Sequence, residues 1–102
     1  MKPMIEVLFF DGCPNQEPTL ELAREVVREL GIEAEIREVR VRDSDEAQRL
    51  RFLGSPSVRV DGVDIDPQAP SVTKFSFCCR MYGESGVPSR ELLVAALNEG
   101  AR

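Results

Sequence analysis

The sequence predicts an α/β domain with a four-stranded mixed sheet, helices on both faces and the element order β-α-β-α-β-β-α. Three observations lead to this fold class. Residues 4–10 form an almost continuously apolar run, which is typical of a central strand covered on both faces. Residues 20–30 then place apolar side chains at helical spacing. Asp61-Gly62 lies between two short valine-rich runs, the pattern of a two-residue β-hairpin turn.

The first helix should settle between Pro14 and Thr19, because proline fits only the first turn of a helix. Apolar residues recur at helical spacing over residues 20–30, and charged residues cover the other side. Gly31 follows the last of these residues and is expected to be the C-cap.

The second strand should lie within residues 32–41, where apolar and charged residues alternate. The alternation slips once, between Ile36 and Val39, which indicates either a bulge or the point at which the strand begins. N-capping residues then cluster at 43–46 and predict a short helix, which we expect Gly54 to close.

The hairpin strands should be residues 58–60 and 63–66, and the last helix should begin within 88–91. The first βαβ unit is expected to be parallel and right-handed, and the hairpin adds two antiparallel strands. A long loop, residues 67–86, leaves the fourth strand. In this topology the loop starts at the edge of the sheet where the first strand ends, close to Cys13.

The composition favours one globular domain over residues 1–102. The chain has 102 residues, 42% of them hydrophobic, which suffices for a single core and argues against disorder. The formal net charge of −5 disfavours nucleic acid and anionic membrane as partners, because both bind basic surfaces. No apolar run approaches the roughly 18 residues that span a bilayer, and the first residues lack the features of a signal peptide. We therefore expect a cytoplasmic protein.

Cys13 is the leading candidate for a functional residue. It follows the first strand and its Asp-Gly turn, and it precedes the first helix. Backbone N–H groups at a helix N-terminus stabilise a thiolate, although a small buried residue at a strand end is the alternative interpretation. Three cysteines are an odd number for a disulfide framework. The absence of histidine excludes Cys-His proteolysis and Ser-His-Asp hydrolysis.

Two segments resemble the active-site motifs of the thioredoxin-like superfamily in its minimal, glutaredoxin-sized form. One is Gly12-Cys13-Pro14 after the first strand, and the other is Gly54-Ser55-Pro56-Ser57-Val58 before the third. The resemblance extends to nearly the whole chain through the order of its elements. It implies a thioredoxin-like fold in which Pro56 is cis and faces Cys13, with a substrate groove shaped by Pro14, Ser55 and Pro56.

A later segment, Cys78-Cys79-Arg80-Met81-Tyr82, resembles the S/C-C-R-x-Y segment of small bacterial proteins of this superfamily. The chain departs from the dithiol pattern at Gln16, where C-x-x-C would place a resolving cysteine. The resemblance therefore favours Cys79 as the resolving thiol. A loop of about 20 residues is long enough to fold back over Cys13. In that position Arg80 would either stabilise the thiolate or be an ordinary surface charge.

Three hypotheses of function follow. In the first, the chain is a thiol–disulfide oxidoreductase whose partner is a disulfide-containing protein or a small thiol. Cys13 attacks a disulfide or an oxidised thiol, and Cys79 or an external thiol such as glutathione resolves the mixed disulfide. This enzyme binds no cofactor. In the second, Cys13, Cys78 and Cys79 bind a soft metal such as mercury, copper, arsenic or zinc. In the third, the chain is a non-catalytic interaction module. The oligomeric state is left open.

Overall fold

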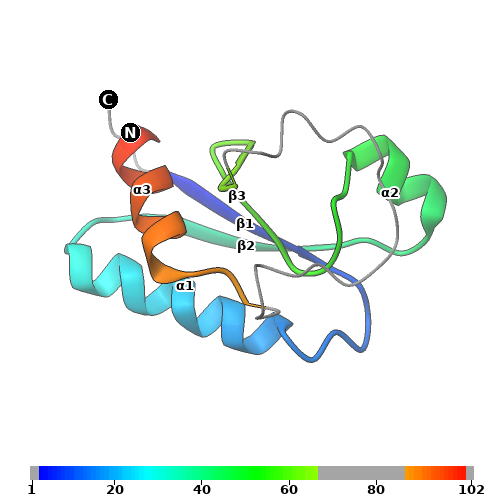
Figure 1. Cartoon of the computed structure of the whole chain (residues 1–102), viewed down its shortest axis with the longest axis horizontal. Helices are drawn as coiled ribbons and strands as arrows, with labels where there is room; N and C mark the ends of the chain where they lie inside the picture. Colours follow the sequence, from blue (N-terminus) through cyan, green and yellow to red (C-terminus); the bar gives the residue numbers. More distant parts are fainter. Residues whose placement is uncertain (1–2, 67–86, 101–102) are drawn as a thin grey trace.

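The computed structural model describes residues 3–66 and 87–100, and these form a mixed sheet of four strands with three helices (Figure 1). The strand order is β2-β1-β3-β4; β1 and β2 are parallel, and the other neighbours are antiparallel. The predicted α/β class is therefore confirmed, and the predicted element order is confirmed over the described residues. The elements are β1 (Met4–Phe9), α1 (Gln16–Leu30), β2 (Glu35–Arg40), α2 (Ser44–Leu50), β3 (Ser57–Val60), β4 (Val63–Asp64) and α3 (Arg90–Gly100).

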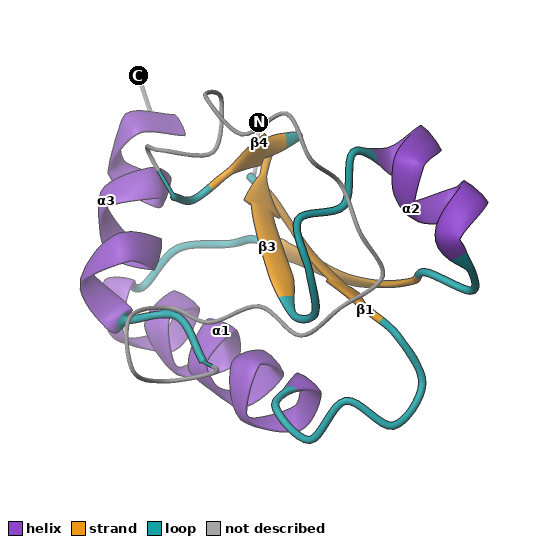
Figure 2. Ribbon diagram, turned by 45° about the vertical axis from the view of Figure 1, so that its right-hand side comes forward, coloured by secondary structure: helices purple, strands orange, loops and turns teal. Residues whose placement is uncertain are grey.

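Helices cover both faces of the sheet, with α1 and α3 on one face and α2 on the other (Figure 2). Successive side chains of a strand point to opposite faces. Accordingly, Ile5 and Val7 of β1 enter the core beneath α1 and α3, whereas Leu8 enters a second core on the side of α2. The continuous apolar run at residues 4–10 thus reflects a strand that serves two cores.

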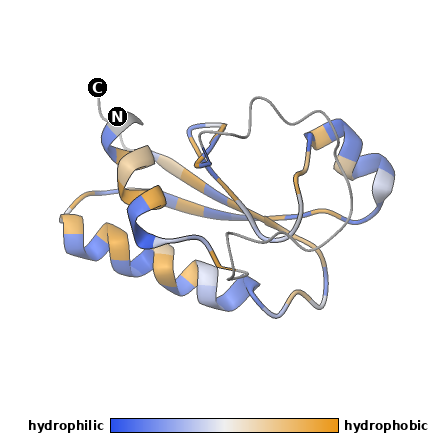
Figure 3. Cartoon of the chain, in the orientation of Figure 1, coloured by the Kyte–Doolittle hydropathy of each residue, from blue (hydrophilic) through white to orange (hydrophobic). Residues whose placement is uncertain are grey.

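The helix α1 begins at Gln16, between Pro14 and Thr19 as predicted, and Gly31 follows it in the left-handed conformation with a φ of 63°. Figure 3 shows polar and apolar residues on each of the helices. Within residues 3–66 and 87–100, no helix is both long enough and apolar enough to cross a membrane.

The slip in the apolar pattern of β2 is neither a bulge nor the start of the strand, so that prediction was wrong. The parallel register continues without interruption from Glu35 to Arg40. Ile36 packs against the core of α1 and α3, and Val39 packs against the core of α2. The two residues therefore point to opposite faces because the sheet is covered on both sides.

The helix α2 ends at Leu50 and not at Gly54, which corrects the predicted end. Arg51 adopts a left-handed conformation with a φ of 57°. The chain thereby turns Phe52 into the core, where its side chain is fully buried, and the Phe52 N–H still donates to the Ala47 carbonyl. Burial of this aromatic side chain explains why a residue other than glycine tolerates the turn.

The Arg59 side chain of β3 binds the C-terminal end of α2. Its Nη2 atom donates to the carbonyl oxygens of Leu50 and Arg51, at 2.6 and 3.1 Å. A cation at the negative end of the helix dipole satisfies carbonyl groups that have no partner within the helix. Asp43 caps the other end as predicted, since its side chain accepts from the Glu46 N–H.

Replacing Arg59 with methionine should lower the free energy of unfolding by about 1–2 kcal/mol, because hydrogen bonds to a charged group are lost while the aliphatic stem is kept. Urea unfolding measures the change. Arg37→Met is the matched control, since Arg37 pairs with Glu35 on the surface of β2 and should cost under about 0.5 kcal/mol. Equal effects of the two substitutions would contradict a role for Arg59 in capping α2.

The predicted hairpin turn at Asp61-Gly62 is confirmed. Both residues have positive φ, 52° and 85°, and Val60 pairs with Val63 across the turn. These angles fit the two-residue turn that matches the twist of the strands. The strand β4 is shorter than predicted. One further hydrogen bond, from the Ile65 N–H to the Val58 carbonyl, extends the antiparallel pairing with β3 beyond Asp64.

The helix α3 begins within the predicted segment, residues 88–91, and ion pairs link its first residue to α1. The Leu92 N–H donates to the Ser89 hydroxyl, a capping contact. Arg90 binds the carboxylates of Glu25 and Glu29. The hydrogen bond from Arg90 to Glu29 and the charge of Glu29 raise the pKa of the guanidinium above its usual value.

Candidate functional site

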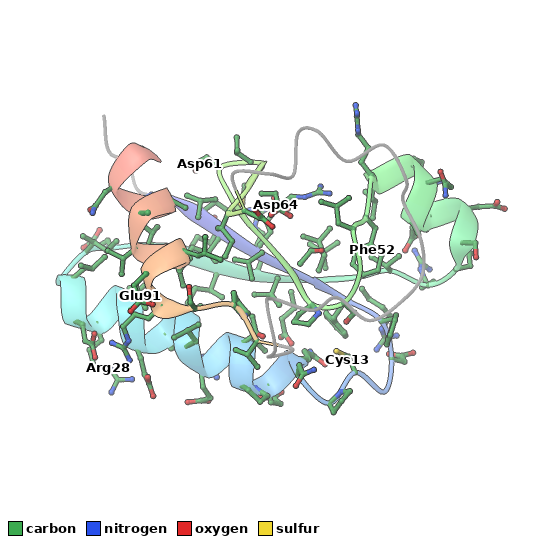
Figure 4. All side chains as sticks on the ribbon, in the orientation of Figure 1. Cys13, Arg28, Phe52, Asp61, Asp64 and Glu91 are labelled. Carbon is green, nitrogen blue, oxygen red and sulfur yellow. The ribbon has the colours of Figure 1, made fainter. Side chains whose placement is uncertain are left out.

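Cys13 lies in the loop between β1 and α1, next to the first turn of the helix (Figure 4). The Cys13 N–H donates to the Phe10 carbonyl at 3.3 Å, and the Gln16 N–H approaches the Cys13 carbonyl at 3.5 Å. Gly12 supplies the positive φ, 84°, that this tight path requires. The cysteine is a free thiol and is 9% exposed. The backbone thus holds a shielded thiol at the place where the strand gives way to the helix.

The residue at the N-cap position of α1 does not cap the helix with its side chain. Asn15 occupies the N-cap position, but its side chain makes no capping hydrogen bond. The Thr19 hydroxyl donates to the Asn15 carbonyl and so does not cover the first amides of the helix. The first amides of a helix form the positive end of its dipole and favour a nearby anion. An anionic group on the Cys13 side of this helix would therefore be stabilised.

The turn before β3 lies beside the Cys13 loop. The register of β1 with β3 pairs Leu8 with Ser57, so the end of β1 and the start of β3 share one edge. The Phe10 N–H donates to the Ser55 hydroxyl oxygen at 3.3 Å. The peptide bond between Ser55 and Pro56 is cis, as predicted. One hydrogen bond therefore links the loop that carries Cys13 to the turn that carries Pro56.

The predicted groove residues differ in exposure. Ser55 and Pro56 are buried, whereas Pro14 is exposed. The Ser57 hydroxyl donates to the Gly54 carbonyl at 2.6 Å and stabilises the same turn. Ser55 thus supports the Cys13 loop from inside the molecule, and Pro14 presents the surface next to Cys13.

Two side chains of β2 hold the segment around Cys13 from the face of the sheet that carries α1. Arg40 Nε lies 3.1 Å from an Asp11 carboxylate oxygen, and Gln16 Nε2 donates to Glu38 at 2.7 Å. Sequence reasoning missed both contacts. The parallel register, in which Phe9 pairs with Arg40, is the signal that leads to them.

Cys78, Cys79 and Arg80 lie outside the described residues, so their predicted roles stay predictions. The soft-metal hypothesis depends on two of these residues. In the part of the chain that the structure describes, no group of three or more histidine, cysteine, aspartate or glutamate side chains could hold a metal ion. This finding leaves a site that combines Cys13 with the two later cysteines untested.

The chain matches no protein-family model, and no curated protein sequence matches it. The function is therefore inferred from the geometry of Cys13, the first turn of α1 and the Ser55–Ser57 turn.

Proposed function

We propose that this chain is a cytoplasmic thioredoxin-like domain and a thiol–disulfide oxidoreductase with Cys13 as its nucleophile. The position of Cys13 carries the proposal: a free thiol between β1 and α1, at the end of the helix where the N-cap residue Asn15 makes no side-chain capping hydrogen bond. The sheet order β2-β1-β3-β4, with helices on both faces, is compatible with a thioredoxin-like layout. The contact between Phe10 and Ser55 adds support, because it keeps the Cys13 loop beside the turn before β3.

The chemistry begins with the Cys13 thiolate. It attacks one sulfur of a substrate disulfide, so a new S–S bond forms to Cys13 while the substrate S–S bond breaks. The departing sulfur leaves as a thiolate with the electron pair and takes a proton from water. One sulfur of the substrate is then free as a thiol, and the other is held in a mixed disulfide with Cys13, so a second thiolate must break that bond to complete the reduction.

Cys79 or glutathione supplies the second thiol. If the Cys79 thiolate attacks the Cys13 sulfur, the substrate leaves as a reduced thiol and an internal disulfide remains. If the glutathione thiolate attacks the Cys13 sulfur instead, the substrate leaves as a reduced thiol and glutathione remains on Cys13 as a mixed disulfide, which a second glutathione can reduce. Gln16 occupies the place of the usual resolving cysteine, and its side chain is bonded to Glu38.

A non-reducing peptide map after equilibration in graded thiol/disulfide buffers tests this function. We expect either a Cys13–Cys79 disulfide with a midpoint between about −120 and −270 mV or a glutathione adduct on Cys13. The Cys78→Ser variant is the control for the choice of partner and should give the same map. If Cys13 stays a free thiol at every potential in the folded protein, the proposal fails. Retention of a thiophilic metal by all three thiols would then favour the soft-metal alternative.

A further inference from the structure

The Asp11–Arg40 ion pair links Cys13 to a charge on a neighbouring strand. Asp11 and Cys13 are separated only by Gly12, so their Cα atoms lie within about 7 Å of each other. The Asp11 carboxylate thus contributes a negative charge to the electrostatic field of the loop that carries Cys13. Arg40 meets that carboxylate at 3.1 Å. The charge closest in sequence to Cys13 is thus compensated from β2.

We propose that Arg40 is a positioning residue that keeps Cys13 reactive by compensating the charge of Asp11. The inference rests on the proposed role of Cys13 as a nucleophile. Three other groups contribute to the field around the loop. Glu38 is bonded to Gln16, Glu17 lies exposed in the first turn of α1, and the amides at the N-terminus of α1 favour an anion. Arg40 therefore offsets a local excess of acidic groups.

The exposure of the pair makes this role separable from stability. The side chains of Arg40 and Asp11 are 59% and 74% exposed. Ion pairs at such exposed positions contribute little to folding. Substitutions at either position should therefore leave the fold intact and change mainly the electrostatic field at Cys13.

The test uses the full chain and the rate of alkylation of Cys13 by iodoacetamide, followed by mass spectrometry of the Cys13 peptide at one fixed pH. Arg40→Gln should slow alkylation by roughly twofold to fivefold, because the Asp11 carboxylate is left uncompensated. Asp11→Asn should accelerate alkylation, because Arg40 then acts without its partner. The double variant should return close to the wild-type rate.

The two single variants should change the alkylation rate in opposite directions, and this distinguishes charge compensation from simple tethering of the loop. If the pair acts only as a tether, both single variants and the double variant shift the rate in the same direction, and the proposal is overturned. Equal rates in all four proteins overturn it as well. Arg40→Lys should retain most of the wild-type rate, and about 1 M salt should shrink the differences between variants.

Arg37→Gln is the matched control, because Arg37 lies on the same strand but pairs with Glu35 instead. Its alkylation rate should equal that of the wild type. Urea unfolding of each variant verifies that the fold is unchanged. Alkylation requires no turnover of a disulfide, so this result is independent of the peptide map. If the alkylation rates are as expected but Cys13 forms no disulfide or glutathione adduct, the role of Arg40 is supported and the proposed oxidoreductase function is rejected.

Discussion

Cys13→Ser should reduce disulfide exchange to the uncatalysed rate, a loss of about 100-fold or more, because a serine hydroxyl does not replace a thiolate in attack on sulfur. The measurement is the rate at which the chain reduces a small neutral disulfide, with an external thiol present to recycle it. Serine is close to cysteine in volume, and Cys13 is 9% exposed, so the substitution leaves the packing of the loop nearly unchanged.

Two further cysteine variants complete this experiment. Cys78→Ser should retain full exchange activity and controls for the loss of any thiol. Cys79→Ser should slow the second step and leave the mixed disulfide on Cys13 long enough to be detected by mass spectrometry. Full activity of Cys13→Ser would exclude Cys13 as the nucleophile. Equal loss of activity in all three variants would instead indicate that the thiols act together, as in metal binding.

Features with local signals could be predicted from the sequence. Gly31 ends α1 and Asp61-Gly62 makes the hairpin turn, because each conformation requires positive φ at residues suited to it. The capping of α2 by Asp43 depends on a residue only three positions away. Cys13 was also identified locally, from its place between a strand and a helix.

The features that were missed depend on contacts between distant segments. Ile36 and Val39 looked like a slip because a pattern on one strand does not show that two cores flank it. The end of α2 is set by the burial of Phe52, which outweighs the preference for glycine at the turn. The Arg40–Asp11 pair follows from the register of β1 with β2 and from no local motif. Element types are therefore more accessible to sequence reasoning than the side chains that surround a site.

The core on the side of α2 offers the most severe test of the fold. Its buried members are Leu8, Val41, Ala47 and Phe52, and Phe52 is the largest of them. Phe52→Ala should lower the free energy of unfolding by about 3–5 kcal/mol, because it removes the aromatic ring and leaves a cavity. This is a large part of the roughly 5–15 kcal/mol that stabilises an ordinary domain. Urea unfolding measures the loss.

Leu50→Ala is the control, because Leu50 is half-buried and packs at the margin of the same cluster. Leu50→Ala should lower the free energy of unfolding by about 1–2 kcal/mol, because the side chain of Leu50 buries less apolar surface than that of Phe52. A loss at Phe52 no greater than that at Leu50 would contradict a core built around the aromatic ring.

Phe52→Ala should also increase the rate at which Cys13 is alkylated. Phe52 stands three residues before Ser55, whose hydroxyl accepts from the Phe10 N–H and links the turn before β3 to the Cys13 loop. Without the ring, the segment between α2 and β3 loses its buried anchor, and local opening becomes less costly than unfolding of the whole domain. Alkylation of Cys13 in the Phe52→Ala protein should therefore be faster than in the wild type under conditions where both are folded. An unchanged rate would mean that the shielding of Cys13 depends on the α1 side of the sheet alone.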